Sequence, residues 1–114
     1  MTQIELLRSI EFHDLPVRGI RFEFDFKQQS FFLDFATFDD DRECYVEWTL
    51  QLKDLVQFAS TEIELASDSD LEIYSFELAA EDPFKGTLLF LTGHSKREFS
   101  INFECRSFIL AERQ

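Results

Sequence analysis

Strict alternation of apolar and polar residues constrains this chain more than any other feature of its sequence. Ile and Phe alternate with charged residues over 20–26, and similar rows occupy 31–37 and 44–52. A period of two residues places alternate side chains on opposite faces of a β-strand, so three half-buried strands are expected. Phe supplies 15 of the 114 residues, whereas Gly (3) and Pro (2) are scarce, and aromatic residues favour strands over helices.

The three rows predict a meander over residues 19–53, because a slip of one residue would turn every side chain to the other face. Lys27–Ser30 and Asp40–Glu43 are the expected turns, and both have an ordinary hairpin length. The register that keeps the apolar rows on one face pairs Phe26 with Phe31, Phe24 with Leu33, Phe22 with Phe35, Thr37 with Val46, Phe35 with Trp48, and Leu33 with Leu50.

The rest of the chain predicts further short strands with less regular alternation. A change of phase near Ile73 and Tyr74 indicates a β-bulge. The segment Thr2–Ile10 fits either helical or strand spacing, and its type stays open. The whole chain, residues 1–114, is therefore expected to be a single all-β domain. It would form an antiparallel sandwich or a partly open barrel of about seven to nine short strands, with room for one short N-terminal helical turn.

The net charge of −12 bears on the kind of partner. Acids outnumber bases by about two to one in both halves of the chain, so the charge is distributed. Nucleic acid and anionic membranes are not expected as partners, because phosphate binding needs clustered Lys and Arg. The negative charge favours basic proteins or cations as partners, or serves simply for solubility. The sequence shows neither a long apolar run nor a signal-peptide pattern, and a cytoplasmic location is expected.

No sequence motif indicates catalysis. Only His13 and His94 could serve as a base for a nucleophile, and His94 lies in an expected turn, where a solvated role is favoured. The chain contains no phosphate-loop, dinucleotide-binding, nucleophile-elbow or zinc-protease string. We expect neither an enzyme nor a cofactor.

Two kinds of possible metal ligand also favour structural roles. Asp39–Asp41 with Glu43 offers oxygen ligands but lacks the Gly and distal Glu of a calcium loop, so a solvated hairpin tip is expected. The same holds for Asp68 and Asp70. Cys44 and Cys105 have no second thiol nearby in sequence and are expected to be reduced core residues rather than a disulfide. No metal site is therefore predicted.

The polar face of the meander offers candidate partner-binding residues. In the expected register Asp34 lies opposite Glu23, Ala36 lies between Arg21 and Glu47, and Phe32 lies beside Asp25 and Gln51. Like charges placed opposite one another are unfavourable, and an outward Phe among them is typical of a docking surface for a basic protein. The predicted partner-binding residues are Glu23, Asp25, Phe32, Asp34, Tyr45 and Glu47. The alternatives are a merely solvated face or one that a second sheet covers.

The string Phe12-His13-Asp14, followed by Leu-Pro and the first clear strand, carries one resemblance. It is similar to a Phe-His-Asp element near the N-terminus of several small bacterial β-domain families. Some of these are uncharacterised, and some are immunity proteins that neutralise toxins of neighbouring cells. The resemblance implies an acidic, partner-blocking protein and brings no catalytic residues. From the residues themselves, His13 and Asp14 are expected to tie the start of the sheet through side-chain to backbone hydrogen bonds, with Asp14 accepting from the turn.

Three functional hypotheses follow. The first is an acidic protein-binding module, an immunity-type inhibitor of a basic target protein. The second is a β-barrel that binds a small apolar ligand in an aromatic interior. The third is a homodimer in which Phe32, Phe38 and Tyr45 pack across a symmetric interface.

Overall fold

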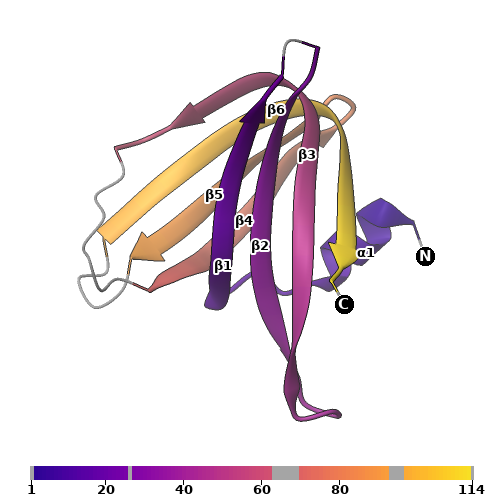
Figure 1. Ribbon diagram of the computed structural model, residues 1–114, viewed down its shortest axis with the longest axis vertical. Helices are drawn as coiled ribbons and strands as arrows, with labels where there is room; N and C mark the ends of the chain where they lie inside the picture. Colours follow the sequence, from indigo (N-terminus) through magenta and orange to yellow (C-terminus); the bar gives the residue numbers. More distant parts are fainter. Residues whose placement is uncertain (1, 26, 63–69, 93–96, 114) are drawn as a thin grey trace.

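The computed structural model describes residues 2–25, 27–62, 70–92 and 97–113. The elements are α1 (Gln3–Ser9), β1 (Leu15–Phe24), β2 (Gln29–Asp39), β3 (Cys44–Ser60), β4 (Leu71–Glu81), β5 (Phe84–Thr92) and β6 (Arg97–Glu112). The strands pair antiparallel in the order β1-β2-β3-β6-β5-β4 (Figure 1). This order closes into a barrel because β4 also pairs with the start of β1, through Leu15 with Ile73 and Pro16 with Glu72. In the described part of the chain, no helix is long and apolar enough to cross a membrane.

The expected all-β antiparallel class is confirmed, but the expected seven to nine strands are wrong, since the described residues form six. The difference lies in β3 and β6, which continue for 17 and 16 residues where shorter strands were expected. Both strands arch over the top of the molecule in Figure 1. In β3 the bend coincides with Asp54, whose φ is 55°, and with a bulge between Leu55 and Gln57. A bulge lets a strand change direction without ending, so one long bent strand takes the place of two short strands.

The predicted register of β2 and β3 is confirmed. Thr37 faces Val46, Phe35 faces Trp48 and Leu33 faces Leu50. The bulge expected near Ile73 and Tyr74 is also confirmed, since the pairing of β4 with β5 shifts between Ile73 and Ser75.

The predicted register of β1 and β2 is wrong. Phe31 faces Phe22, and Leu33 faces Ile20. Phe26, the expected partner of Phe31, lies outside the described residues. The turn is shorter than expected, because Asp25 and Gln28 already exchange two backbone hydrogen bonds. The slip is even-numbered, so the apolar row stays on its predicted face. However, the shift places Ile20, Phe22 and Phe24 beyond the end of the core, where they are exposed.

The core consists of side chains from the inward rows of the strands. The largest fully buried members are Phe31, Phe35, Phe90, Leu33, Leu50, Leu52, Ile73, Leu88, Leu110 and Cys105. The segment Thr2–Ile10, whose type the sequence left undecided, contains the helix α1. Thr2 caps this helix by accepting a hydrogen bond from the Glu5 amide at 3.2 Å. Leu7 is buried, and Gln3 Oε1 accepts from the Leu110 amide at 2.5 Å, so the helix is fixed to β6.

Both cysteines are free thiols, as expected. Cys105 lies in the core, but the expectation that Cys44 is also a core residue is wrong, because Cys44 is exposed. Cys44 starts β3 opposite Asp39, at the outer end of the β2–β3 hairpin, where no core reaches it.

The two described glycines within strands give a matched pair for testing the packing. A Cβ on Gly86 would lie 2.9 Å from both the Glu77 carbonyl oxygen and Phe103 Cζ, whereas on Gly19 the nearest atom would be Asp34 Oδ2 at 3.8 Å. We expect Gly86→Ala to lower the free energy of unfolding by about 1–3 kcal/mol, through overpacking. Gly19→Ala should change it by less than about 1 kcal/mol. Urea unfolding measures both, and equal stabilities would contradict this packing.

The Cys105 thiol makes stability depend on pH in the alkaline range. Burial raises the pKa of Cys105 from 9.0 to about 11. Between pH 9 and 11 the unfolded chain loses this proton while the folded chain retains it, so the free energy of unfolding falls as pH rises. The loss should reach at most about 2–3 kcal/mol. In Cys105→Ala this share of the slope should vanish; identical slopes of the free energy of unfolding against pH for the two proteins would contradict the assignment.

Candidate functional site

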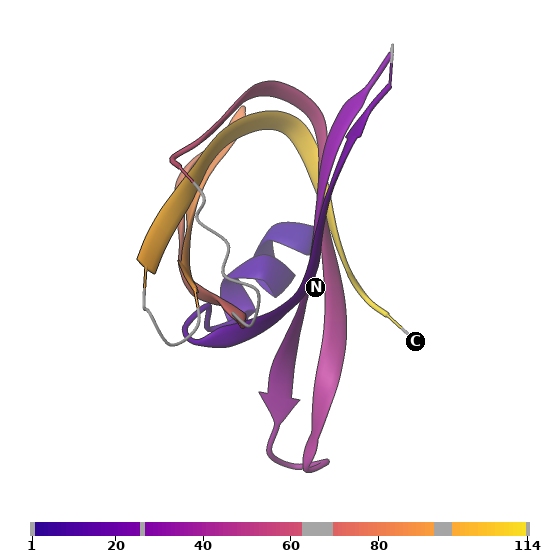
Figure 2. The same ribbon diagram turned by 60° about the vertical axis from the view of Figure 1, so that its left-hand side comes forward.

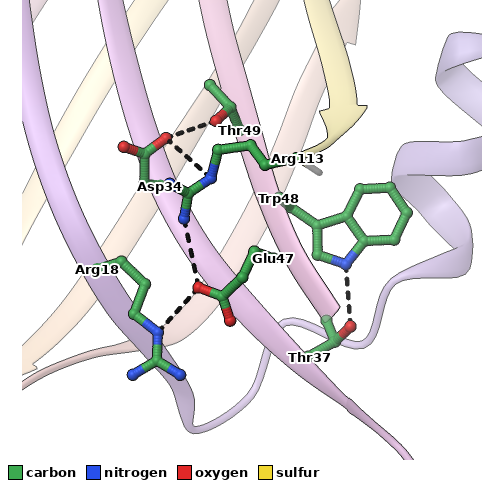
Figure 3. A network of polar contacts seen from close by, with 7 residues as sticks. All are labelled: Arg18, Asp34, Thr37, Glu47, Trp48, Thr49 and Arg113. Atoms are coloured by element: carbon green, nitrogen blue, oxygen red, sulfur yellow. Dashed lines mark hydrogen bonds and ion pairs between the residues drawn. The ribbon is translucent and has the colours of Figure 1, made fainter. Parts of the chain in front are cut away.

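The outward face of β1, β2 and β3 carries a network of arginines and carboxylates (Figure 3). Glu47 Oε1 lies at its centre, 3.0 Å from Arg18 Nε and 3.3 Å from Arg113 Nη2. Asp34 Oδ1 accepts from Thr49 Oγ1 at 2.5 Å and lies 3.8 Å from Arg113 Nε. The network therefore joins β1, β2, β3 and the residue that follows β6.

A second arginine contact lies further along the same face. Arg21 Nε lies 3.1 Å from Glu23 Oε1, and its guanidinium stands 4.1 Å from the centre of the Phe32 ring. The outward Phe32 is thus partly covered by a cation, an arrangement that is favourable for both groups. Of the four acids predicted for this face, Glu23, Asp34 and Glu47 each have an arginine partner, and Asp25 has none among the described residues.

The like-charge pair expected on this face is not formed. Asp34 faces Gly19 in β1 rather than Glu23, and Glu23 faces Ser30. The contacts of Ala36 with Glu47 and of Phe32 with Gln51 are confirmed, because they depend only on the β2–β3 register. The expected neighbours in β1 are wrong for both residues: Phe32 faces Arg21, and Asp25 belongs to the turn, where its Oδ1 accepts from the Lys27 amide at 3.3 Å.

The β2–β3 hairpin projects beyond the rest of the molecule, at the bottom of Figures 1 and 2. Phe38 and Tyr45 face each other across it, with ring centres 5.3 Å apart in an edge-to-face arrangement. They are 52% and 54% exposed. Arg18 lies 5.4 Å from the centre of the Tyr45 ring, so the charged network and the aromatic pair are contiguous.

The tip of this hairpin is acidic and internally ordered. Asp39 accepts hydrogen bonds from the amides of Asp41 and Arg42 and from Arg42 Nε at 2.8 Å. The hydrogen bond from the Arg42 side chain is the main cause that lowers the pKa of Asp39, so this carboxyl stays ionised. The carboxylates of Asp40, Asp41 and Glu43 form no ion pair with any described residue, and all three residues are exposed.

A groove of about 520 Å³ adjoins the base of the hairpin. On one side it is lined by the connection between α1 and β1, and on the other by β2 and β3. Its lining residues are Ser9, Ile10, Glu11, His13, Leu15, Thr37, Phe38 and Trp48. Trp48 Nε1 donates to Thr37 Oγ1 at 2.9 Å, which fixes the indole in the groove wall.

Phe12, His13 and Asp14 have separate roles. Phe12 packs on Phe35 and Phe76, with ring centres 5.4 Å and 5.2 Å away. His13 Nδ1 lies 3.3 Å from the Tyr74 carbonyl oxygen, so the expected tie to the sheet exists and reaches β4. The expectation that Asp14 accepts from the turn is wrong, because its carboxylate lies 3.2 Å from His13 Nε2 instead. The motif therefore fixes the chain where β1 meets β4, beside the groove.

The sequence analysis did not find Arg18, Arg113 or the groove. Arg18 lies on a strand whose register was misjudged, and Arg113 lies 66 positions from Glu47 on a strand whose place in the sheet was unknown. The exposed pairing of Phe38 with Tyr45 could have been found, since both flank a correctly predicted turn. Among the described residues, no three or more His, Cys, Asp or Glu side chains lie so that they could hold a metal ion together.

Comparison of the chain with protein-family models, with curated proteins and with solved structures finds no match. The arrangement of the residues therefore carries the functional argument. His94 and Asp68 lie outside the described residues, and the ligand-binding hypothesis stays a prediction.

Glu47 provides a test of the network. In Glu47→Gln, Arg18 loses its charged partner in the network and Arg113 keeps only the longer contact with Asp34. We expect the free energy of unfolding to fall by about 0.5–1.5 kcal/mol, with the loss shrinking at high salt. Glu77→Gln is the matched control, because Glu77 is exposed and forms no ion pair with any described residue. Equal effects of the two substitutions in denaturant titrations at low salt would show that the network adds no stability.

Proposed function

We propose that this protein is an acidic protein-binding module, an immunity-type inhibitor that engages a basic site on its target through the β2–β3 hairpin. One observation carries the proposal: the projecting hairpin combines two half-exposed aromatic rings with three carboxylates that no described residue neutralises. The resemblance of Phe12-His13-Asp14 to an element of some immunity proteins points the same way.

The aromatic pair supplies the apolar part of such a contact. Tyr and Arg are among the residue types that contribute most to binding energy at protein interfaces, and Tyr45 stands beside Arg18 here. The edge-to-face packing of Phe38 on Tyr45 and the ladder that runs to Asp39 and Cys44 hold both rings in place. A surface that is ordered before binding loses less entropy when it docks.

The acidic tip supplies the electrostatic part. Uncompensated charges at the end of a projecting hairpin reach a partner first, and such charges raise the rate of association more than they change the final affinity. The network around Glu47 is less suited to this task, because its acids are already paired with arginines. We therefore assign the network to holding the base of the hairpin. The adjoining groove offers space for a side chain of the partner.

Site-specific photo-crosslinking tests where the partner docks. A photoreactive amino acid at position 45 should capture a basic protein in cells that produce this chain. The matched control is position 56, because Tyr45 and Val56 are 54% and 57% exposed. Capture of the same proteins from both positions, or of an acidic protein from position 45, would contradict the proposal.

Association kinetics with the captured protein test the charges. We expect Asp40→Lys/Asp41→Lys/Glu43→Lys to slow association about tenfold or more at low salt, with a smaller effect at high salt. The control Asp70→Lys/Glu77→Lys/Glu98→Lys changes the net charge equally on exposed residues elsewhere, and it should slow association by less than about threefold. Equal slowing by both triple variants would show that only the net charge matters.

A further inference from the structure

The outer edge of β1 is open along most of its length. On one side β1 pairs with β2 from Val17 to Phe24, but on the other side β4 pairs only with Leu15 and Pro16. Within the described ranges, no strand continues this pairing beyond Pro16. The β1–β2 turn also rises past the arch of β3 and β6 (Figure 2), so neither of these strands covers the free edge there.

The pairing at the turn determines which backbone groups the free edge presents. Asp25 and Gln28 exchange both of their backbone hydrogen bonds. In an antiparallel ladder, residues that bond to the partner strand alternate with residues whose amide and carbonyl point away from it. Arg21 and Glu23 therefore bond to β2, and the amides and carbonyls of Ile20, Phe22 and Phe24 point outward.

The same three residues carry exposed apolar side chains. Ile20, Phe22 and Phe24 are 41%, 46% and 77% exposed. Phe22 rests on Phe58, with ring centres 5.3 Å apart, and Phe24 stacks beside Phe22 at 6.2 Å. Exposed strand edges usually carry charged side chains or prolines that prevent pairing. β1 does carry Arg21 and Glu23, but they lie on one face, and the apolar row of Ile20, Phe22 and Phe24 on the other face stays exposed, which favours the addition of another strand.

We propose that the partner at this edge is a second copy of the same chain, with the two β1 strands antiparallel and Phe22 on the two-fold axis. In that register Ile20 of each copy faces Phe24 of the other, so apolar residues meet along one face. The outward groups of all three residues then bond across the axis, in about six backbone hydrogen bonds.

The charges on the other face of β1 support this register. With Phe22 on the axis, Arg21 of each copy lies opposite Glu23 of the other, and opposite charges in facing positions stabilise paired strands. Both side chains already lie together on this face, since Arg21 Nε is 3.1 Å from Glu23 Oε1 in the single chain. The charged residues of β1 are Arg18, Arg21 and Glu23, so this strand is locally basic in a chain of net charge −12. The local charge of this edge therefore reduces the repulsion between two acidic copies.

A charge-swap experiment tests the register, with sedimentation equilibrium over a range of concentrations as the measurement. In this register residue 21 of each copy lies opposite residue 23 of the other, which gives two facing pairs. Arg21→Glu places Glu opposite Glu in both pairs, and Glu23→Arg places Arg opposite Arg. We expect each variant alone to dissociate about tenfold more readily than the unmodified dimer. Mixing the two variants restores opposite charges in both pairs, so the mixture should form a heterodimer with a dissociation constant within about threefold of the original.

Amide hydrogen exchange provides a second readout that needs no substitution. The Ile20, Phe22 and Phe24 amides should become protected as protein concentration rises, because they bond only across the dimer axis. The Arg21 and Glu23 amides bond to β2 in either state and should keep constant protection, which makes them internal controls.

Several outcomes would overturn the proposal. These are a protein that stays monomeric at millimolar concentration, a dimer that neither single variant weakens, and a mixture of variants that forms no heterodimer. A variant that simply failed to fold could not regain pairing on mixing, so the rescue separates misfolding from lost complementarity. The hairpin variants Asp40→Lys/Asp41→Lys/Glu43→Lys should not weaken dimerisation, which keeps this test separate from that of the proposed function.

Discussion

The pairing of β2 with β3 is the constraint on which the rest of the structure depends. It places Phe31, Leu33 and Leu50 inside the barrel and leaves Asp34 and Glu47 on the outer face. Because side chains alternate strictly along a strand, a slip of one residue would move the apolar row into water. The acidic tip, the aromatic pair and the arginine network all take their positions from this ladder. Its extension beyond the core also makes the hairpin available to a partner.

The contrast between the two hairpins shows what alternation can and cannot predict. The β2–β3 register followed from the sequence, because the ladder closes at Asp39 and Cys44, on either side of the predicted turn Asp40–Glu43. The β1–β2 register did not, because an even-numbered slip keeps every side chain on its face and so leaves the pattern satisfied. The turn distinguishes the expected register from the observed one. The polar run 27–30 suggested a four-residue turn, but Asp25 and Gln28 pair through backbone hydrogen bonds and leave only two residues between them. That slip moves Phe22 and Phe24 from the expected core to the exposed edge.

The candidate site was predictable to the same limited degree. Tyr45, Phe32 and Glu47 lie on the outer face as expected, because this needed only the parity of β2 and β3. Their partners Arg18, Arg21 and Arg113 come from a strand that had slipped and from the end of β6, whose position depends on long-range strand order. Charge totals could not show this. A chain with about twice as many acids as bases can still pair the acids of one face, here Glu23, Asp34 and Glu47, with arginines, so the position of the uncompensated acids matters more than their number.

The two proposed contact surfaces lie at opposite ends of the same strands. The β1–β2 turn lies at the top of Figure 1, and the β2–β3 hairpin lies at the bottom. In an antiparallel β1–β1 dimer the two hairpins would point in opposite directions, away from the axis, so neither would be buried by dimerisation. Such a dimer could hold two target molecules but could not place both hairpins on one compact target. Dimerisation would therefore add no avidity toward a monomeric target, because avidity requires simultaneous contacts with the same partner. It would instead protect an aromatic strand edge that other chains could otherwise pair with.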